Sequence, residues 1–207
     1  MQIQYPFRAL APSVDGDVLQ ILGSIRAPLA VADLARLIPE RSRTGVALAA
    51  ERLTSQGIVL RDVVGHTRSY RLNDDHLLAT AVRMIADSRG QLLDRLKEIT
   101  GELDASYVAL FGSAATGRMT PESDIDLLVI HSGDRAPDWD RQLSDAADKI
   151  TRLTGNEARI VDLHETDLDA PHLTDFIDDV TDEGITLHGE AGQLRSPRNR
   201  RRYERSA

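Results

Sequence analysis

The sequence predicts an α+β protein of two modules joined by a helical segment. In the first third of the chain, apolar residues recur at helical spacing and two strand-like runs follow. In the second half, short apolar runs typical of buried strands alternate with helical patterns. The charge is divided as well: residues 1–75 carry a balance of +1, residues 76–191 of −14 and residues 192–207 of +5. A length of 207 residues fits two small domains or one large one.

The composition excludes several classes of protein. The chain has no cysteine, so disulfide scaffolds, thiolate metal sites and cysteine nucleophiles are excluded. No segment approaches the roughly 18 apolar residues of a membrane span, and the N-terminus has no apolar signal region. We therefore expect a soluble, cytoplasmic protein with no membrane partner. The acidic middle of the chain repels nucleic acid unless metal ions intervene, whereas either end can contact phosphate.

The first module is expected over residues 10–74. Gly57 ends its third helix, as a C-terminal glycine does, and its two strands are joined around Gly65. The predicted elements, in chain order, are three helices and two strands: Asp15–Arg26, Val31–Ile38, Ser42 or Thr44 to Gln56, 58–64 and 68–72.

This order of elements is typical of a winged helix-turn-helix. The run RTGVALAAERLTSQGIV, which starts at Arg43, resembles the recognition helix and first wing strand of bacterial winged-helix regulators. The resemblance implies binding to double-stranded DNA, with the third helix in the major groove. The alternative is a module that packs against protein and leaves its arginines solvated. The residues that would contact DNA are Arg41, Arg43 and Thr44 at the helix start and Arg61, Arg68 and Arg71 on the wing.

Residues 75–103 form a helical stretch that is expected to link the two modules. Its apolar face is broken, and Gly90 interrupts the pattern, so two helices are expected there. The apolar stripe predicts either a homodimer contact or packing on the protein's own domains, and both readings stay open.

The chemistry is concentrated in residues 104–190. A short apolar strand, 106–111, leads into Gly112, where the missing side chain lets backbone approach a ligand. Ser113 follows with a hydroxyl and an amide at an expected helix start, which is an anion-binding position. The next strand opens with Asp124 and Asp126, and strand residues two apart point to the same face. The two carboxylates are therefore expected to converge.

Two adjacent carboxylates repel each other and call for a counter-ion. Mg²⁺ is a hard cation that proteins hold with one or two carboxylates together with substrate phosphates. A phosphate site beside a carboxylate pair therefore indicates chemistry on a nucleoside triphosphate.

The run GSAATG from Gly112, followed by SDIDLLV from Ser123, resembles the DNA polymerase beta-like nucleotidyltransferase superfamily, in particular its minimal type. The resemblance covers residues 104–190. It implies a small mixed sheet flanked by helices. The residue pattern itself predicts helices at 139–153 and 172–182 and a last strand at 184–189. The resemblance also implies metal-dependent transfer of a nucleoside monophosphate from a triphosphate such as ATP to an acceptor hydroxyl on a protein, tRNA or small molecule.

The resemblance also assigns the site residues. Two Mg²⁺ ions, or Mn²⁺ in their place, would be held by Asp124, Asp126 and a third acid on a neighbouring strand. Asp162, at the end of the expected strand 157–163, is the candidate for this acid and for accepting the proton of the acceptor. Its rivals, Glu157, Glu165 and Asp167, flank that strand. The nucleotide would be bound by Gly112, Ser113, Arg118 and Ser123.

One departure from the family pattern leaves an alternative open. Many minimal members carry arginine where this chain has Thr116, although Arg118 lies two residues away. The alternative is a transcriptional regulator in which the transferase fold senses a nucleotide, and a further one is an antitoxin-like partner that binds or modifies a toxin. The basic residues 191–207 are expected to be disordered, as either a phosphate-binding arm or an inert tail.

Overall fold

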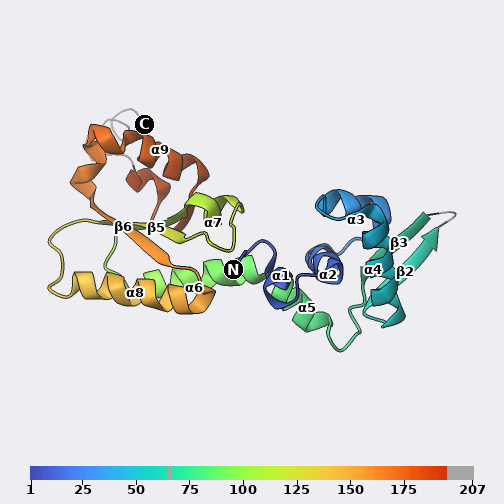
Figure 1. Cartoon of the computed structure of the whole chain (residues 1–207). Helices are drawn as coiled ribbons and strands as arrows, with labels where there is room; N and C mark the ends of the chain where they lie inside the picture. Colours follow the sequence, from blue (N-terminus) through green and yellow to red (C-terminus); the bar gives the residue numbers. More distant parts are fainter. Residues whose placement is uncertain (65–66, 195–207) are drawn as a thin grey trace. The chain divides into compact units, whose positions relative to one another are not determined.

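The computed structural model describes residues 1–64 and 67–194. The chain divides into two compact units, residues 2–91 and the part from residue 92 onward (Figure 1). The division falls inside the stretch 75–103, so these residues do not form a module of their own. The expected turn at Gly65 and the expected disorder of the tail beyond residue 194 lie outside the described residues.

The N-terminal unit combines helices with a small antiparallel sheet. The three predicted helices and two predicted strands are present, each shifted by three residues or fewer at its ends. The short elements α1 and β1 were not predicted, because five and two residues carry no readable period. The sheet order is β1-β3-β2. The elements are α1 (Pro6–Leu10), α2 (Val14–Ser24), β1 (Leu29–Ala30), α3 (Val31–Leu37), α4 (Arg43–Ser55), β2 (Val59–Val64), β3 (Thr67–Leu72) and α5 (Ala79–Ala86).

Local signals set the ends of α4. The Ser42 hydroxyl accepts a hydrogen bond from the Gly45 amide at 3.1 Å and caps the helix. Gly57, with φ of +77°, adopts the left-handed conformation that stops it. The apolar face of α4 joins a core that also includes Ala79 and Val82 of α5. Burial of these two residues explains why α5 belongs to this unit.

The predicted break at Gly90 was wrong. The interruption lies at Asp87, between α5 and α6 (Ser88–Thr100), and Gly90 is inside α6. A Cβ on Gly90 would lie 2.6 Å from Oδ1 of Asp87. Glycine therefore makes room for the Asp87 carboxylate and does not end the helix.

The C-terminal unit is built around a four-stranded sheet of order β6-β5-β4-β7. Strands β5 and β6 are parallel and are connected through α8, and the other pairs are antiparallel. The expected strands and both expected long helices are present within a few residues. The elements are β4 (Tyr107–Phe111), α7 (Gly112–Thr116), β5 (Ile125–His131), α8 (Trp139–Thr154), β6 (Ala158–His164), α9 (Thr174–Glu183) and β7 (Ile185–His188), with 3-10 turns at Glu165–Asp169, Pro171–Leu173 and Ala191–Leu194.

The two faces of this sheet are covered by different helices, α9 on one side and α8 on the other (Figure 1). We call them the α9 face and the α8 face. Alternate strand residues assign the α9 face, because they share one core cluster with residues of α9: Tyr107, Ala109, Leu128, Ile130, Ile177 and Val180. Asp126 has the same parity as Leu128 and Ile130, so it lies on the α9 face.

Among the described residues, no helix is long and apolar enough to cross a membrane.

Candidate active site

The candidate site is where the end of β4 and the starts of β5 and β6 meet. The register places Phe111 of β4 and Arg159 of β6 on either side of Asp126. Gly112 follows β4 with φ of +69°, a conformation that favours glycine. A Cβ at Gly112 would lie only 2.9 Å from Oδ2 of Asp126. The backbone conformation and the nearby carboxylate both require glycine at this position.

The turn that carries Ser113 is held together by its own hydrogen bonds. The Thr116 hydroxyl donates to the carbonyl of Gly112 at 3.1 Å, and the Arg118 amide donates to the carbonyl of Ser113 at 2.9 Å. Gly117, with φ of +72°, ends this short helix. Ser113 is thus half-buried in a fixed turn, directly after Gly112. The Thr116 hydroxyl serves the turn itself.

Asp124 and Asp126 form the acidic part of the site. Asp124 comes just before β5, Asp126 lies inside it, and Ile125 between them is fully buried. Burial raises the pKa of the Asp126 carboxyl, the negative charge of Asp124 raises this pKa further, and the positive charge of Arg159 opposes both. The prediction that the two carboxylates converge is therefore consistent with their electrostatic coupling.

Arg159 is a site residue that the sequence analysis did not single out. Its Nη1 lies 2.7 Å from Oδ2 of Asp124, and its side chain is 59% exposed. Its Nη2 lies 3.5 Å from the Glu157 carboxylate. Strand topology could have predicted it. If the strand after α8 runs parallel to β5, a residue near the start of that strand lies beside Asp126.

Asp162 does not join this site, and its assignment as the third acid is corrected here. The register pairs Asp162 with Val129, whose side chain points to the α8 face, opposite to that of Asp126. There Asp162 accepts a hydrogen bond from Trp139 Nε1 at 3.0 Å and pairs with Arg135 at 2.8 Å. Its carboxylate is a structural element of the α8 face.

None of the rival acids completes a three-acid set. Glu157 is exposed beside Arg159, and Asp167 accepts a hydrogen bond from the amide of His164 at 3.0 Å. Within the described part of the chain, no group of three or more His, Asp or Glu side chains is arranged to hold a metal ion. Of the expected metal-binding acids, the fold brings Asp124 and Asp126 to this edge of the sheet. Two carboxylates suit one hard divalent cation that also takes oxygen ligands from a phosphate.

The loop before Asp124 is organised by Asn156, a buried residue that the sequence analysis missed. Its Nδ2 donates to the carbonyls of Pro121 at 3.2 Å and Ser123 at 2.6 Å. The Ser123 hydroxyl accepts from the Thr120 amide at 2.9 Å. Ser123, expected to bind nucleotide, thus has its hydroxyl engaged in closing the turn that presents Asp124.

Arg118, the other expected nucleotide contact, is paired with Glu183 of α9. Its Nη2 lies 2.9 Å from the Glu183 carboxylate, and its Nε donates to the Thr116 hydroxyl at 3.1 Å. Both side chains of the ion pair are largely exposed. Solvent weakens such a pair.

In the N-terminal unit, most of the arginines expected to contact DNA have carboxylate partners. Arg41 pairs with Asp17 at 2.7 Å, and Asp17 is buried and also paired with Arg8. Arg41 is therefore needed to neutralise a buried charge. On the wing, Arg71 lies 3.4 Å from Asp62.

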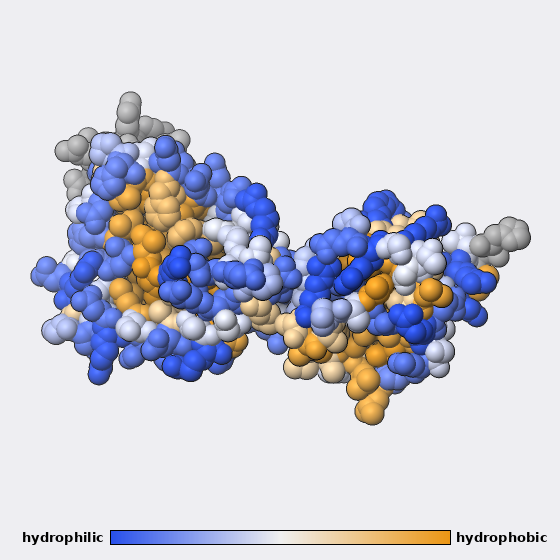
Figure 2. Space-filling model, in the orientation of Figure 1, coloured by the Kyte–Doolittle hydropathy of each residue, from blue (hydrophilic) through white to orange (hydrophobic). Residues whose placement is uncertain are grey.

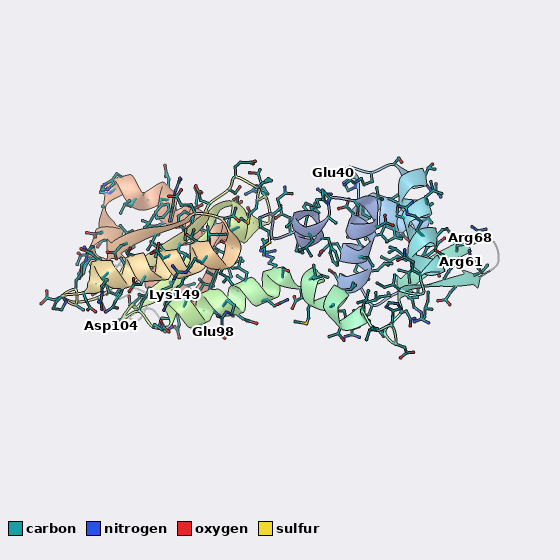
Figure 3. The ribbon with its side chains drawn as sticks, turned by 60° about the horizontal axis from the view of Figure 1, so that its bottom comes forward. Glu40, Arg61, Arg68, Glu98, Asp104 and Lys149 are labelled. Carbon is teal, nitrogen blue, oxygen red and sulfur yellow. The ribbon has the colours of Figure 1, made fainter. Side chains whose placement is uncertain are left out.

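Arg61 and Arg68 lie together on the β2–β3 hairpin, where they share Glu51 (Figure 3). The hydrogen bond that Tyr70 donates to Glu51, at 2.7 Å, is the main reason that the pKa of this carboxyl is lowered, and the two arginines add to the effect. At the start of α4, Arg43 and Thr44 are exposed. Within the described residues, Arg43 has no carboxylate partner.

Comparison with known proteins identifies the C-terminal part of the chain. Residues 90–187 match the family model of the nucleotidyltransferase domain. None of the curated proteins matches the chain. The match supports an enzyme of the nucleotidyltransferase class in this part of the chain.

Two solved structures can be set beside it. A toxin–antitoxin crystallised with AMP-PNP is 17% identical, with a TM-score of 0.37, and the match covers 55% of this chain and 82% of the other. A mutant of the toxin–antitoxin MntA–HpeT is also 17% identical, with a TM-score of 0.38 and coverage of 55% and 92%.

Proposed function

We propose that the C-terminal unit transfers a nucleoside monophosphate from a nucleoside triphosphate to an acceptor hydroxyl. The observation that carries the proposal is the close approach of the Gly112–Ser113 turn to the Asp124–Asp126 pair. A phosphate at the turn would be within reach of a cation held by the two carboxylates. In the reaction, the acceptor oxygen forms a bond to the α-phosphorus, the bond from the α-phosphorus to pyrophosphate breaks, and the acceptor hydroxyl loses its proton to solvent water.

The residues of the chain divide the work as follows. The Gly112 and Ser113 amides and the Ser113 hydroxyl donate hydrogen bonds to the triphosphate. Asp124 and Asp126 would hold Mg²⁺, or Mn²⁺, and the bound ion would supply positive charge to the phosphates and to the departing pyrophosphate. Arg118 is free to leave Glu183 and contact the outer phosphates.

Labelling tests this function directly. The protein is incubated with Mg²⁺, one α-labelled nucleoside triphosphate at a time and total cell extract, beside the Asp124→Ala/Asp126→Ala double variant. We expect label on a protein, RNA or small-molecule fraction with the wild type alone. Equal labelling by the double variant would contradict the proposal, and the labelled fraction names the acceptor class.

We further propose that residues 2–91 are a winged helix-turn-helix that binds double-stranded DNA. The order of elements and the exposed Arg43 and Thr44 at the start of α4 support it. Because Arg41, Arg61 and Arg68 are paired with carboxylates, we expect Arg43 to make the largest single contribution. Arg43→Ala should weaken DNA binding about tenfold, whereas Arg52→Ala, which removes the same charge near the other end of α4, should not. Affinity should also fall steeply with salt, and a flat salt dependence would contradict DNA binding.

A second candidate function is that of a regulator in which the nucleotidyltransferase fold senses a nucleotide. The observation that favours it is Arg159, which neutralises Asp124 where a third carboxylate was expected. In this case nucleotide binding would change DNA affinity without any transfer. Nucleotide-dependent DNA binding, combined with an absence of labelled product for all four triphosphates, would support the regulator over the enzyme.

The exposed apolar residues around α5 support a homodimer. Leu77, Leu78 and Met84 are 93%, 51% and 58% exposed, and apolar side chains gather on the surface of this unit (Figure 2). Light scattering should give a dimer mass for the wild type and a monomer mass for Leu77→Glu. A monomeric wild type would contradict this contact.

A further inference from the structure

We propose that the nucleotide site takes one divalent cation, and that the guanidinium of Arg159 supplies the positive charge of a second. The inference rests on the proposed nucleotidyl transfer and adds the metal content of its site. The site was expected to hold three acids, but the fold brings together Asp124, Asp126 and Arg159.

The sheet leaves no carboxylate beside Asp126 on either neighbouring strand. The residue across β4 is Phe111 and the residue across β6 is Arg159. Arg159 shares the α9 face with Asp126, because residues in register on adjacent strands point to the same side. The chain therefore places a guanidinium beside Asp126. Glu157, two residues before Arg159, is exposed and pairs with that guanidinium, its carboxylate 3.5 Å from Nη2.

The contact between Arg159 and Asp124 restricts the oxygens that remain for a metal ion. Nη1 of Arg159 lies 2.7 Å from Oδ2 of Asp124. For an ion held by Asp124 and Asp126, the other Asp124 oxygen and the Asp126 carboxylate would remain as ligands. A second ion would need the oxygen that Arg159 holds, and would also meet its positive charge.

The balance of charge points the same way. Asp124, Asp126 and Glu157 with the Arg159 guanidinium and one divalent ion sum to zero net charge. Three carboxylates with two divalent ions and no guanidinium would leave a single positive charge. A second divalent ion beside Arg159 would add two more positive charges at close range, which is strongly unfavourable.

Arginine suits this role chemically. The guanidinium stays charged at any physiological pH, and its planar fork can pair with a carboxylate or a phosphate. The Arg159 side chain is 59% exposed, so it has room to contact a substrate phosphate while it remains near Asp124. We therefore assign Arg159 to the site as a positioning residue for the triphosphate and for Asp124.

Electron paramagnetic resonance of Mn²⁺ tests the inference without turnover. The full chain is mixed with two equivalents of Mn²⁺ and, in separate samples, excess α,β-methylene analogues of ATP, GTP, CTP and UTP. We expect the wild type to show a single uncoupled Mn²⁺ in the sample whose analogue binds. Arg159→Asp should show two Mn²⁺ ions with the spin coupling expected at about 3.5–4 Å.

The matched control is Arg152→Asp, which makes the same charge change at an exposed position of α8 and should keep the single uncoupled ion. Arg159→Glu serves as a second variant if Arg159→Asp does not fold. A coupled pair in the wild type would overturn the inference and leave the proposed transfer intact. A single uncoupled ion in both folded Arg159 variants would also overturn it, whereas no bound Mn²⁺ in any wild-type sample would overturn both proposals.

Discussion

Asp126 and Asp162 lie on neighbouring parallel strands, yet they belong to opposite faces of one sheet. On the α9 face, Asp126 is close to Asp124, Arg159 and the Gly112 turn, and its pKa is raised by burial. On the α8 face, Asp162 is held by Trp139 and Arg135. Among the described residues, the Asp126 carboxylate has no hydrogen-bond donor or ion-pair partner of its own, and this leaves its oxygens available to a cation. The Asp162 carboxylate uses its Oδ2 for both of its contacts, so its removal should affect stability rather than chemistry.

The largest expected difference between the two faces is in activity. Asp126→Asn should reduce the rate of nucleotidyl transfer more than about 100-fold, because it removes charge that acts on the reacting phosphates. Asp162→Asn makes the same chemical change and should stay within about tenfold of the wild type. Initial rates of label transfer measure both. Equal losses in the two folded variants would contradict the separation of the faces.

A smaller difference is expected between two glycines of similar conformation. Gly112 has φ of +69° and Gly155 has φ of +73°, so alanine at either position costs about 1–2 kcal/mol of backbone strain. A Cβ at Gly155 has no neighbour within 4 Å, whereas one at Gly112 would lie 2.9 Å from Asp126.

Thermal unfolding should therefore show only the loss from backbone strain in Gly155→Ala. The loss of stability in Gly112→Ala should be larger, because the new Cβ also meets Asp126. Only Gly112→Ala should also impair transfer, because Asp126 has to move. Full activity in a folded Gly112→Ala variant would argue against the close approach of this turn to the carboxylate.

Stability as a function of pH provides a third contrast. A raised pKa means that folding disfavours the charged form of Asp126, so its charge destabilises the protein above the unfolded-state pKa of about 4. This destabilisation declines as the pH falls through the raised folded-state pKa and is absent below the unfolded-state pKa. Asp126→Asn should thus raise Tm at pH 7 and lose this advantage at acidic pH. Asp162→Asn should lower the unfolding free energy at pH 7 by about 1–3 kcal/mol, and Tm with it. A lower Tm for Asp126→Asn at pH 7 would contradict the assignment.

The smallest effects should come from the two arginines. Both Arg135 and Arg159 are about half exposed, so replacing either with alanine should change stability by less than about 1 kcal/mol. Arg159→Ala should nevertheless lower the Mg²⁺ concentration needed for half-maximal transfer several-fold, because a competing cation leaves Asp124. Arg135→Ala should leave it unchanged. The transfer rate is measured as a function of Mg²⁺ concentration for each variant. Identical curves for Arg159→Ala and Arg135→Ala would count against a role for Arg159.

Much of the fold follows from local patterns. Helical spacing, Ser42 and Gly57 predict α4, and the GSAATG and SDIDLLV runs predict the turn and the carboxylates at the start of β5. The same patterns failed for Asp162, because an apolar strand ending in an acid does not reveal its register. A shift of one residue moves every side chain to the other face of the sheet.

Partners that are distant in sequence were also out of reach. Arg41 looks like a free cation at the start of a helix, but its partner Asp17 lies 24 residues earlier. The role of Arg159 can be recognised only when β6 is placed beside β5. For both arginines, the partner is set by the tertiary structure and cannot be predicted from neighbouring residues in the sequence.

The central claim is that the chemistry lies on the α9 face, at Asp124 and Asp126. Its most direct test is a crystal grown with Mn²⁺ and a non-hydrolysable triphosphate, with the anomalous signal of manganese used to locate the ion. We predict one peak in contact with Asp124, Asp126 and the phosphates, and none at Asp162. A peak coordinated by Asp162 would contradict the account.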